Sequence, residues 1–127
     1  MQIVNLLSVG AAAVVGAWLR WGLGMALNPL FPTIPLGTLA ANLTGGFLMG
    51  LFMGITRNHA LIPESARLAI ATGFLGSLTT FSTFSAETVT LLANHELLFS
   101  AVIIVGHVAG TLCATLFGIY TVKIVTS

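Results

Sequence analysis

Charge is what this sequence has least of. Of its 127 residues only 6% are charged, whereas 57% are hydrophobic. A typical soluble domain carries about 25% charged residues. The mean hydropathy of +1.06 is equally far from that of a water-soluble surface. Because such a chain cannot cover a water-facing exterior with charge, its composition indicates an integral membrane protein whose solvent is lipid.

Cysteine and the usual catalytic motifs are also scarce. The single cysteine, Cys113, excludes an internal disulfide and a cysteine metal cluster, and its apolar neighbours favour a packing role. The sequence contains neither a phosphate-binding P-loop nor a recognisable nucleophile–base pair or metal-ligand cluster. We therefore expect a protein that is not an enzyme, is not driven by ATP and does not bind nucleic acid.

Long uncharged runs are what the sequence does have. A membrane-crossing helix needs about 20 mostly apolar residues. The charge-free runs predict an all-α membrane protein, a single domain over residues 1–127 with spans near 3–27, 36–56, 67–92 and 98–122. The links between them, "NPLFPTIP", "RNHALIPES" and "ANHE", are short and leave no room for a soluble domain.

The basic residues specify the orientation only weakly. With four spans, both termini share a side with the link at residues 57–65. That side holds Arg57, Arg67 and Lys123, against Arg20 at the end of the first span. The positive-inside rule then favours cytoplasmic termini. The margin is thin, which also suits a protein that inserts in both orientations.

The second span combines glycines with two polar residues. Gly46, Gly50 and Gly54 recur at steps of four, which is typical of a face that packs against another helix. Thr38 and Asn42 continue the same stripe. An asparagine amide in lipid must be hydrogen-bonded or functional, so Asn42 either joins helices or lines a pore.

The fourth span carries polar residues at the same spacing. These are His107, Thr111 and Thr115, flanked by the small residues Gly110, Ala114 and Gly118. A single threonine here most often bonds back to its own helix. Together with Asn42, the stripe could form one wall of a polar track. The small-residue stripes also lead us to expect a homo-oligomer, with a dimer as the first choice.

The stretch "GFLGSLTTFSTFSAE", residues 73–87, is the most polar part of any span. Its glycines and hydroxyl residues are poor material for an unbroken helix, so we expect a break near residues 76–80. Non-helical backbone at membrane depth persists only where it is buried or lines a cavity. The carbonyl oxygens that it frees would suit a small cation. The alternative is a gently kinked helix whose hydroxyls bond its own carbonyls.

Two phenylalanines follow the expected break. Phe81 and Phe84 share a helix face, and an adjacent stripe contains Thr80, Thr83 and Glu87. Aromatic ring edges are electropositive and can stabilise an anion without a formal positive charge. Plain packing is the commoner role of two such rings. With hydroxyls and an asparagine amide nearby, they indicate a site for a small, strongly hydrated anion.

At this point the sequence resembles a known family. "GSLTTFSTFSAE", "GTLAANLTGGFLMG" and "GAWLRWGLG" resemble segments of the Fluc (CrcB) family of small fluoride channels, and the resemblance covers nearly the whole chain. It implies an antiparallel, dual-topology homodimer with two pores, in the bacterial plasma (inner) membrane. Its activity would be passive, fluoride-selective export from the cytoplasm.

The resemblance also implies roles for individual residues. Asn42, Phe81 and Phe84 would contact fluoride in the pore, and Arg20 would lie near the aqueous vestibule. The backbone carbonyls of Gly76 and Thr79 would hold a structural Na⁺ shared by both subunits. Further residues of the polar track would be Thr38, Thr83, Glu87, His107 and Thr111.

Two other functions are alternatives to the channel. A small four-span, proton-coupled multidrug exporter would share the dimer plan, but it would need a carboxylate in the first span. Here the intramembrane acid is Glu87, in the third span, and one tyrosine and two tryptophans offer little to a large aromatic cation. A subunit of a larger membrane complex is the other alternative, although nothing in the sequence requires a partner.

Overall fold

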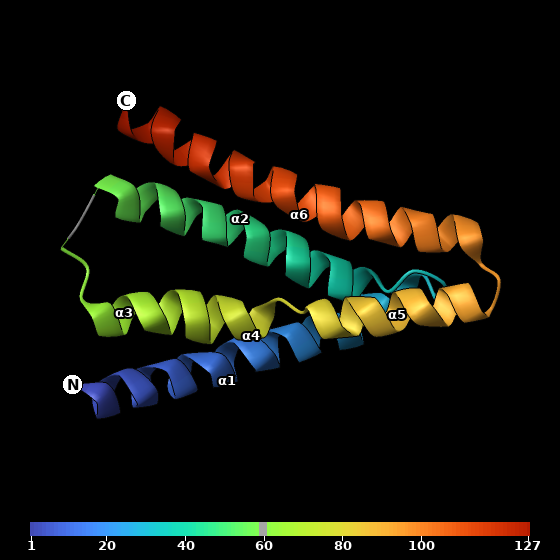
Figure 1. Ribbon diagram of the computed structural model, residues 1–127, viewed down its shortest axis with the longest axis horizontal. Helices are drawn as coiled ribbons and strands as arrows, with labels where there is room; N and C mark the ends of the chain where they lie inside the picture. The colour runs from blue at the N-terminus through green and yellow to red at the C-terminus, as the bar shows by residue number, and fades with distance from the viewer. Residues whose placement is uncertain (59–60) are drawn as a thin grey trace.

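The computed structural model describes residues 1–58 and 61–127, and the described residues form an all-helical bundle (Figure 1). Helices α1 (Gln2–Leu27), α2 (Leu36–Asn58) and α6 (Leu97–Thr126) are long and continuous. The remaining span runs from Glu64 to Ala93. Each of these four segments is long and apolar enough to cross a membrane, so the prediction of four membrane-spanning helices is confirmed.

The third span is built from several pieces. It begins with α3 (Glu64–Leu68), continues as the π-helix η2 (Ala69–Leu75) and the short α4 (Gly76–Leu78), and ends with α5 (Phe81–Ala93). Between α4 and α5, Thr79 and Thr80 have extended ψ angles of 155° and 123°. Figure 1 shows this non-helical link near the middle of the bundle.

Both chain termini lie at one end of the bundle, together with the end of α2 and the start of α3 (Figure 1). The predicted link over residues 57–65 contains residues 59 and 60, which lie outside the described residues. At the other end, α1 leads into the 3₁₀-helix η1 (Asn28–Leu30). There the Asn28 side chain accepts a hydrogen bond from the Gly37 N–H at 2.7 Å, which ties the end of α1 to the start of α2.

The glycine stripe of α2 packs against α6. A β-carbon at Gly50 would overlap the carbonyl oxygen of Thr115, and one at Gly54 would lie 2.8 Å from a Val122 side-chain atom. The predicted packing face is therefore confirmed, but its partner is a helix of the same chain. These glycines consequently give no support to the expected dimer, because their close approach is used within one subunit.

Helix α1 packs closely on the third span just before the extended link. A β-carbon at Gly16 would overlap the Phe74 carbonyl oxygen, and one at Gly73 would lie 2.6 Å from the Val9 carbonyl oxygen. Phe74 also packs against a buried cluster formed by Ala41, Leu75 and Leu78. This packing fixes the end of α4, and with it the position at which the helix stops.

Candidate functional site

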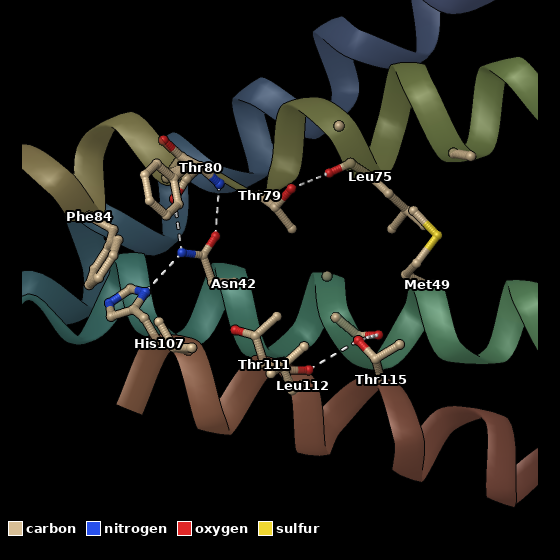
Figure 2. Close-up of a pocket in the computed structure, with 16 residues that line it drawn as sticks. Asn42, Met49, Leu75, Thr79, Thr80, Phe84, His107, Thr111, Leu112 and Thr115 are labelled. Carbon is tan, nitrogen blue, oxygen red and sulfur yellow. Dashed lines mark hydrogen bonds between the residues drawn. The ribbon is translucent and has the colours of Figure 1, made fainter. Parts of the chain in front are cut away.

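Asn42 holds the extended link through its backbone. The Thr80 N–H donates to Asn42 Oδ1 at 2.7 Å, and Asn42 Nδ2 donates to the Thr80 carbonyl at 2.9 Å. Figure 2 shows the amide facing the link from α2. The Asn42 side chain thus satisfies a donor and an acceptor that the interrupted helix leaves free. Of the two roles considered for Asn42, joining helices is directly observed, and the residue also lines a cavity.

A third hydrogen bond joins Asn42 to α6. Its Nδ2 lies 2.9 Å from His107 Nδ1. The His107 ring packs against the Phe84 ring with centroids 4.6 Å apart and planes inclined by 30°. Asn42, Phe84 and His107 are 8%, 7% and 4% exposed. We call these three residues the polar–aromatic layer; α2, α5 and α6 each contribute one of them.

A cavity of about 440 Å³ adjoins this layer. Its remaining lining is largely apolar and includes Met49, Leu75 and Leu112. The structure brings the following predicted site residues together around it: Asn42, Gly76, Thr79, Phe81, Phe84, His107 and Thr111. We refer to it as the main cavity.

A second cavity, of about 320 Å³, also adjoins the link. It is lined by Arg20, Thr38 and Thr83, three further residues of the predicted site. Thr80 lines both cavities, so the extended link contributes to each of them. We call it the arginine cavity.

Arg20 lies in the second half of α1, which ends at Leu27 as the predicted first span does. Its Nε donates to the Ser77 carbonyl at 3.0 Å. That carbonyl lies at the end of α4, where the helical bonds stop, so the guanidinium supplies the donor that the broken helix lacks.

Glu87 joins the site indirectly. Its Oε1 accepts a hydrogen bond from the Thr38 hydroxyl at 2.6 Å. Its Oε2 is buried and has no hydrogen-bond partner in the described part of the chain. Glu87 lines neither cavity and is linked to the arginine cavity through Thr38.

The two phenylalanines differ sharply in burial. Their ring centroids are 5.5 Å apart in an edge-to-face arrangement, with planes at 67°. Phe84 is buried in the polar–aromatic layer, but Phe81 is 76% exposed. In one chain the Phe81 side of the main cavity is therefore open.

The carbonyl groups of the extended link are partly free. The Thr80 N–H, which would reach the Gly76 carbonyl in an unbroken helix, bonds Asn42 instead. The Thr83 N–H, which would reach the Thr79 carbonyl, bonds the Thr80 hydroxyl at 3.1 Å. Within the described residues, no hydrogen bond to the carbonyl oxygen of Gly76 or Thr79 is found. These are the two carbonyls that the resemblance assigns to Na⁺.

Comparison with known proteins places the chain in a family. The family model described as "CrcB-like protein, Camphor Resistance (CrcB)" matches residues 7–119. The chain belongs to the CrcB family. A relative from Nitrosospira multiformis named "Fluoride-specific ion channel FluC" is 57% identical, over 97% of this chain and 96% of its own length. A relative of the same name from Thiobacillus denitrificans is 53% identical, over 92% of this chain and 94% of its own length. Another from Ralstonia pickettii is 46% identical, over 97% of this chain and 98% of its own length.

Membership of the CrcB family confirms the resemblance seen in the sequence. Combined with four apolar helices, it identifies the chain as a multi-pass integral membrane protein. The relatives are named as ion channels, so the prediction that the chain is not an enzyme is also confirmed.

Sequence reasoning missed parts of the site that act through the backbone. Thr80 was seen as one residue of a polar stripe, yet its main chain bonds Asn42 and its side chain caps α5. The Thr-x-x-Thr spacing of Thr80 and Thr83 at the start of α5 was an available signal for that cap. Ser77 gave no such signal, because its carbonyl contributes only where α4 stops beside Arg20.

Thr111 and Thr115 both line the main cavity, as the polar-track hypothesis requires. The Thr115 hydroxyl lies 3.0 Å from both the Thr111 and the Gly46 carbonyl oxygens. Back-bonding to its own helix is therefore the observed behaviour of Thr115, combined with a bond to α2.

Proposed function

We propose that this CrcB-family chain is a fluoride-selective channel that lets F⁻ leave the cytoplasm passively through the bacterial inner membrane. The observation that carries the proposal is the polar–aromatic layer of Asn42, Phe84 and His107 beside a membrane-embedded cavity. The names of the relatives support it, since those proteins are called fluoride-specific ion channels.

The chemistry of the main cavity suits fluoride. Fluoride is small and a strong hydrogen-bond acceptor, so amide and hydroxyl donors and aromatic edges can replace its water. When His107 is neutral, none of the residues that line the main cavity carries a formal charge. This suits a channel, because a fixed cation would hold the anion too tightly for fast passage. The membrane potential, negative inside, drives an anion outward by about 2.3 kcal/mol per 100 mV, so a selective leak is sufficient for export.

Anion efflux from liposomes that contain only this protein tests the function. We expect rapid efflux of fluoride and no efflux of chloride above that of empty liposomes, because chloride is larger and gains less from short hydrogen bonds. Fluoride and chloride leaving at equal rates would contradict the proposal.

We propose further that the channel is an antiparallel, dual-topology homodimer with two pores. The open Phe81 side of the main cavity supports this, because a pore needs a wall that one chain does not supply. The thin margin in basic residues supports insertion in both orientations. C-terminal tags should then be reachable from both sides of the membrane. If every C-terminus were found in the cytoplasm, dual topology would be wrong.

We also propose a structural Na⁺ on the axis of this dimer. Two antiparallel copies would bring together the Gly76 and Thr79 carbonyls of each, which have no hydrogen-bond partner in the described residues. Four carbonyl oxygens would satisfy a hard cation, and the cation would offset the cost of burying them.

Exchange of the cation tests this site. When a large organic cation replaces Na⁺ during purification, we expect the dimer to dissociate more readily and fluoride flux to fall, with recovery on return of Na⁺. A structural ion should not be transported, so Na⁺ moving in a fixed ratio with F⁻ would contradict the proposal, as would a dimer indifferent to the exchange.

A further inference from the structure

The Thr80 backbone fixes the orientation of the Asn42 amide. The Thr80 N–H needs an acceptor and the Thr80 carbonyl needs a donor, and the two ends of the amide meet them at 2.7 and 2.9 Å. A flipped amide would set N–H against N–H and oxygen against oxygen. Nδ2 of Asn42 is therefore the atom that faces His107.

This orientation also fixes the state of His107. An amide nitrogen only donates, so His107 Nδ1 must accept and carries no proton in this arrangement. The proton of the neutral imidazole then lies on Nε2, which is buried and has no hydrogen-bond partner in the part of the chain that the structure describes. A second proton would put Nδ1–H against the Asn42 N–H and break the bond between the two side chains.

Both N–H groups of Asn42 are thus occupied: one by the Thr80 carbonyl and one by His107. An anion that reaches Asn42 must displace one of these acceptors. The Thr80 bond belongs to a two-point clamp that supports the extended link, whereas the His107 bond stands alone. The bond to His107 is therefore the one that an anion replaces more easily.

We propose that His107 is a positioning residue that accepts a hydrogen bond from the second N–H of Asn42 when no anion is bound. An arriving anion replaces His107 as the acceptor of this N–H. Protonation of His107 also breaks the bond and leaves the N–H free. The inference rests on the proposed fluoride channel and adds a pH-dependent affinity to it. In acid, the free Asn42 N–H and the imidazolium would both face the anion. Fluoride should then bind more tightly, and the maximal current should fall because the ion leaves more slowly.

Few other charges surround His107. Helix α5 carries Glu87 as its ionisable side chain, held at Thr38, and α1 carries Arg20, held at the Ser77 carbonyl. Helix α2 has Arg57 in its last turn. Helix α6 itself has Cys113, Tyr120 and Lys123, all C-terminal to His107. Glu87 is the group whose titration must be separated from that of His107.

Currents across planar bilayers test the proposal, because neutral HF carries no current. The half-saturating fluoride concentration is compared at about pH 7.5 and about pH 5.5, above and below the ordinary pKa of histidine of about 6.5. In the unmodified protein we expect the half-saturating fluoride concentration to be roughly fivefold lower at the acidic pH, because the anion then no longer has to break the bond between Asn42 and His107. The Glu87→Gln variant should retain this difference, and so should His95→Gln, which changes the histidine of the α5–α6 link.

Two variants of His107 are expected to differ in their affinity for fluoride. His107→Gln keeps an acceptor for Asn42 but cannot titrate, so its half-saturating concentration should match the neutral-pH value at both pH values. His107→Leu removes the acceptor and should bind fluoride more tightly at both. A nitrogen-15 NMR spectrum of His107 adds a readout that does not depend on transport: at neutral pH it should show protonated Nε2 and bare Nδ1.

The outcomes separate this inference from the proposed function. Absence of any fluoride current from the unmodified protein would refute the channel itself. A fluoride current with the same half-saturating concentration at both pH values would overturn the role of His107 alone. The same would follow if His107→Gln kept the full pH response, or if NMR placed the proton on Nδ1.

Discussion

Asn42→Asp is expected to lower fluoride flux by about a hundredfold or more. A carboxylate has no N–H, so it would present oxygen to the Thr80 carbonyl and to His107 Nδ1, the two groups that now receive the amide hydrogens. The contact with the Thr80 carbonyl would become repulsive unless the carboxylate were protonated. The contact with His107 would survive only if the imidazole moved its proton from Nε2 to Nδ1. The change would also place a negative charge next to the proposed anion path.

The control is the same substitution at Asn94, which lies exposed at the end of α5. Asn94→Asp adds the same charge outside the site and should leave flux at the level of the unmodified protein. Flux is measured in liposomes after each protein elutes as a single folded species in detergent. Normal fluoride flux through folded Asn42→Asp would show that the amide is a structural link and not part of the anion path.

The sequence was sufficient to predict the helical framework. Long uncharged runs fix the number of spans, because a charge at membrane depth is costly whatever the fold. The period of four in Gly46, Gly50 and Gly54 predicted a packing face, and the structure confirms one. Periodicity could not name the partner of that face, since the same stripe serves contacts within a chain and between chains equally well.

The site was predicted as a set of residue types rather than as a set of bonds. Asn42, Phe84 and His107 were all candidates, and the structure brings them into contact. Their pairing depends on which helix lies beside which, and a single sequence does not encode that in its spacing. The separation of Arg20 and Thr38 into a second cavity was missed for the same reason.

Backbone groups were the least predictable part. Thr80 bonds Asn42 through its main chain, and Arg20 bonds the Ser77 carbonyl. Backbone carbonyls occur in every residue and backbone N–H groups in every residue except proline, so the residue type does not indicate which of them will bond a side chain. They become available only where the helix stops, and the glycines and hydroxyls of residues 76–80 gave only the approximate region.

Gly50→Ala is expected to destabilise the folded protein by about 1–3 kcal/mol, as overpacking of a close contact does. The new β-carbon would overlap the Thr115 carbonyl oxygen and would lie 3.0 Å from the Gly118 Cα. These are backbone atoms of α6, which cannot rotate away as a side chain can, so α2 and α6 must separate. Because Asn42 lies on α2 and His107 on α6, fluoride flux should fall together with stability.

Gly10→Ala is the matched control for this prediction. Gly10 lies in α1, and apart from its chain neighbours and the backbone of its own helix, no described atom lies within 4 Å of a β-carbon placed there. Alanine favours a helix over glycine by about 1 kcal/mol, so this variant should be as stable as the unmodified protein or more so. Thermal unfolding in detergent gives the comparison. If Gly50→Ala unfolded at the same temperature as Gly10→Ala, the close contact between α2 and α6 would not be what holds the polar–aromatic layer together.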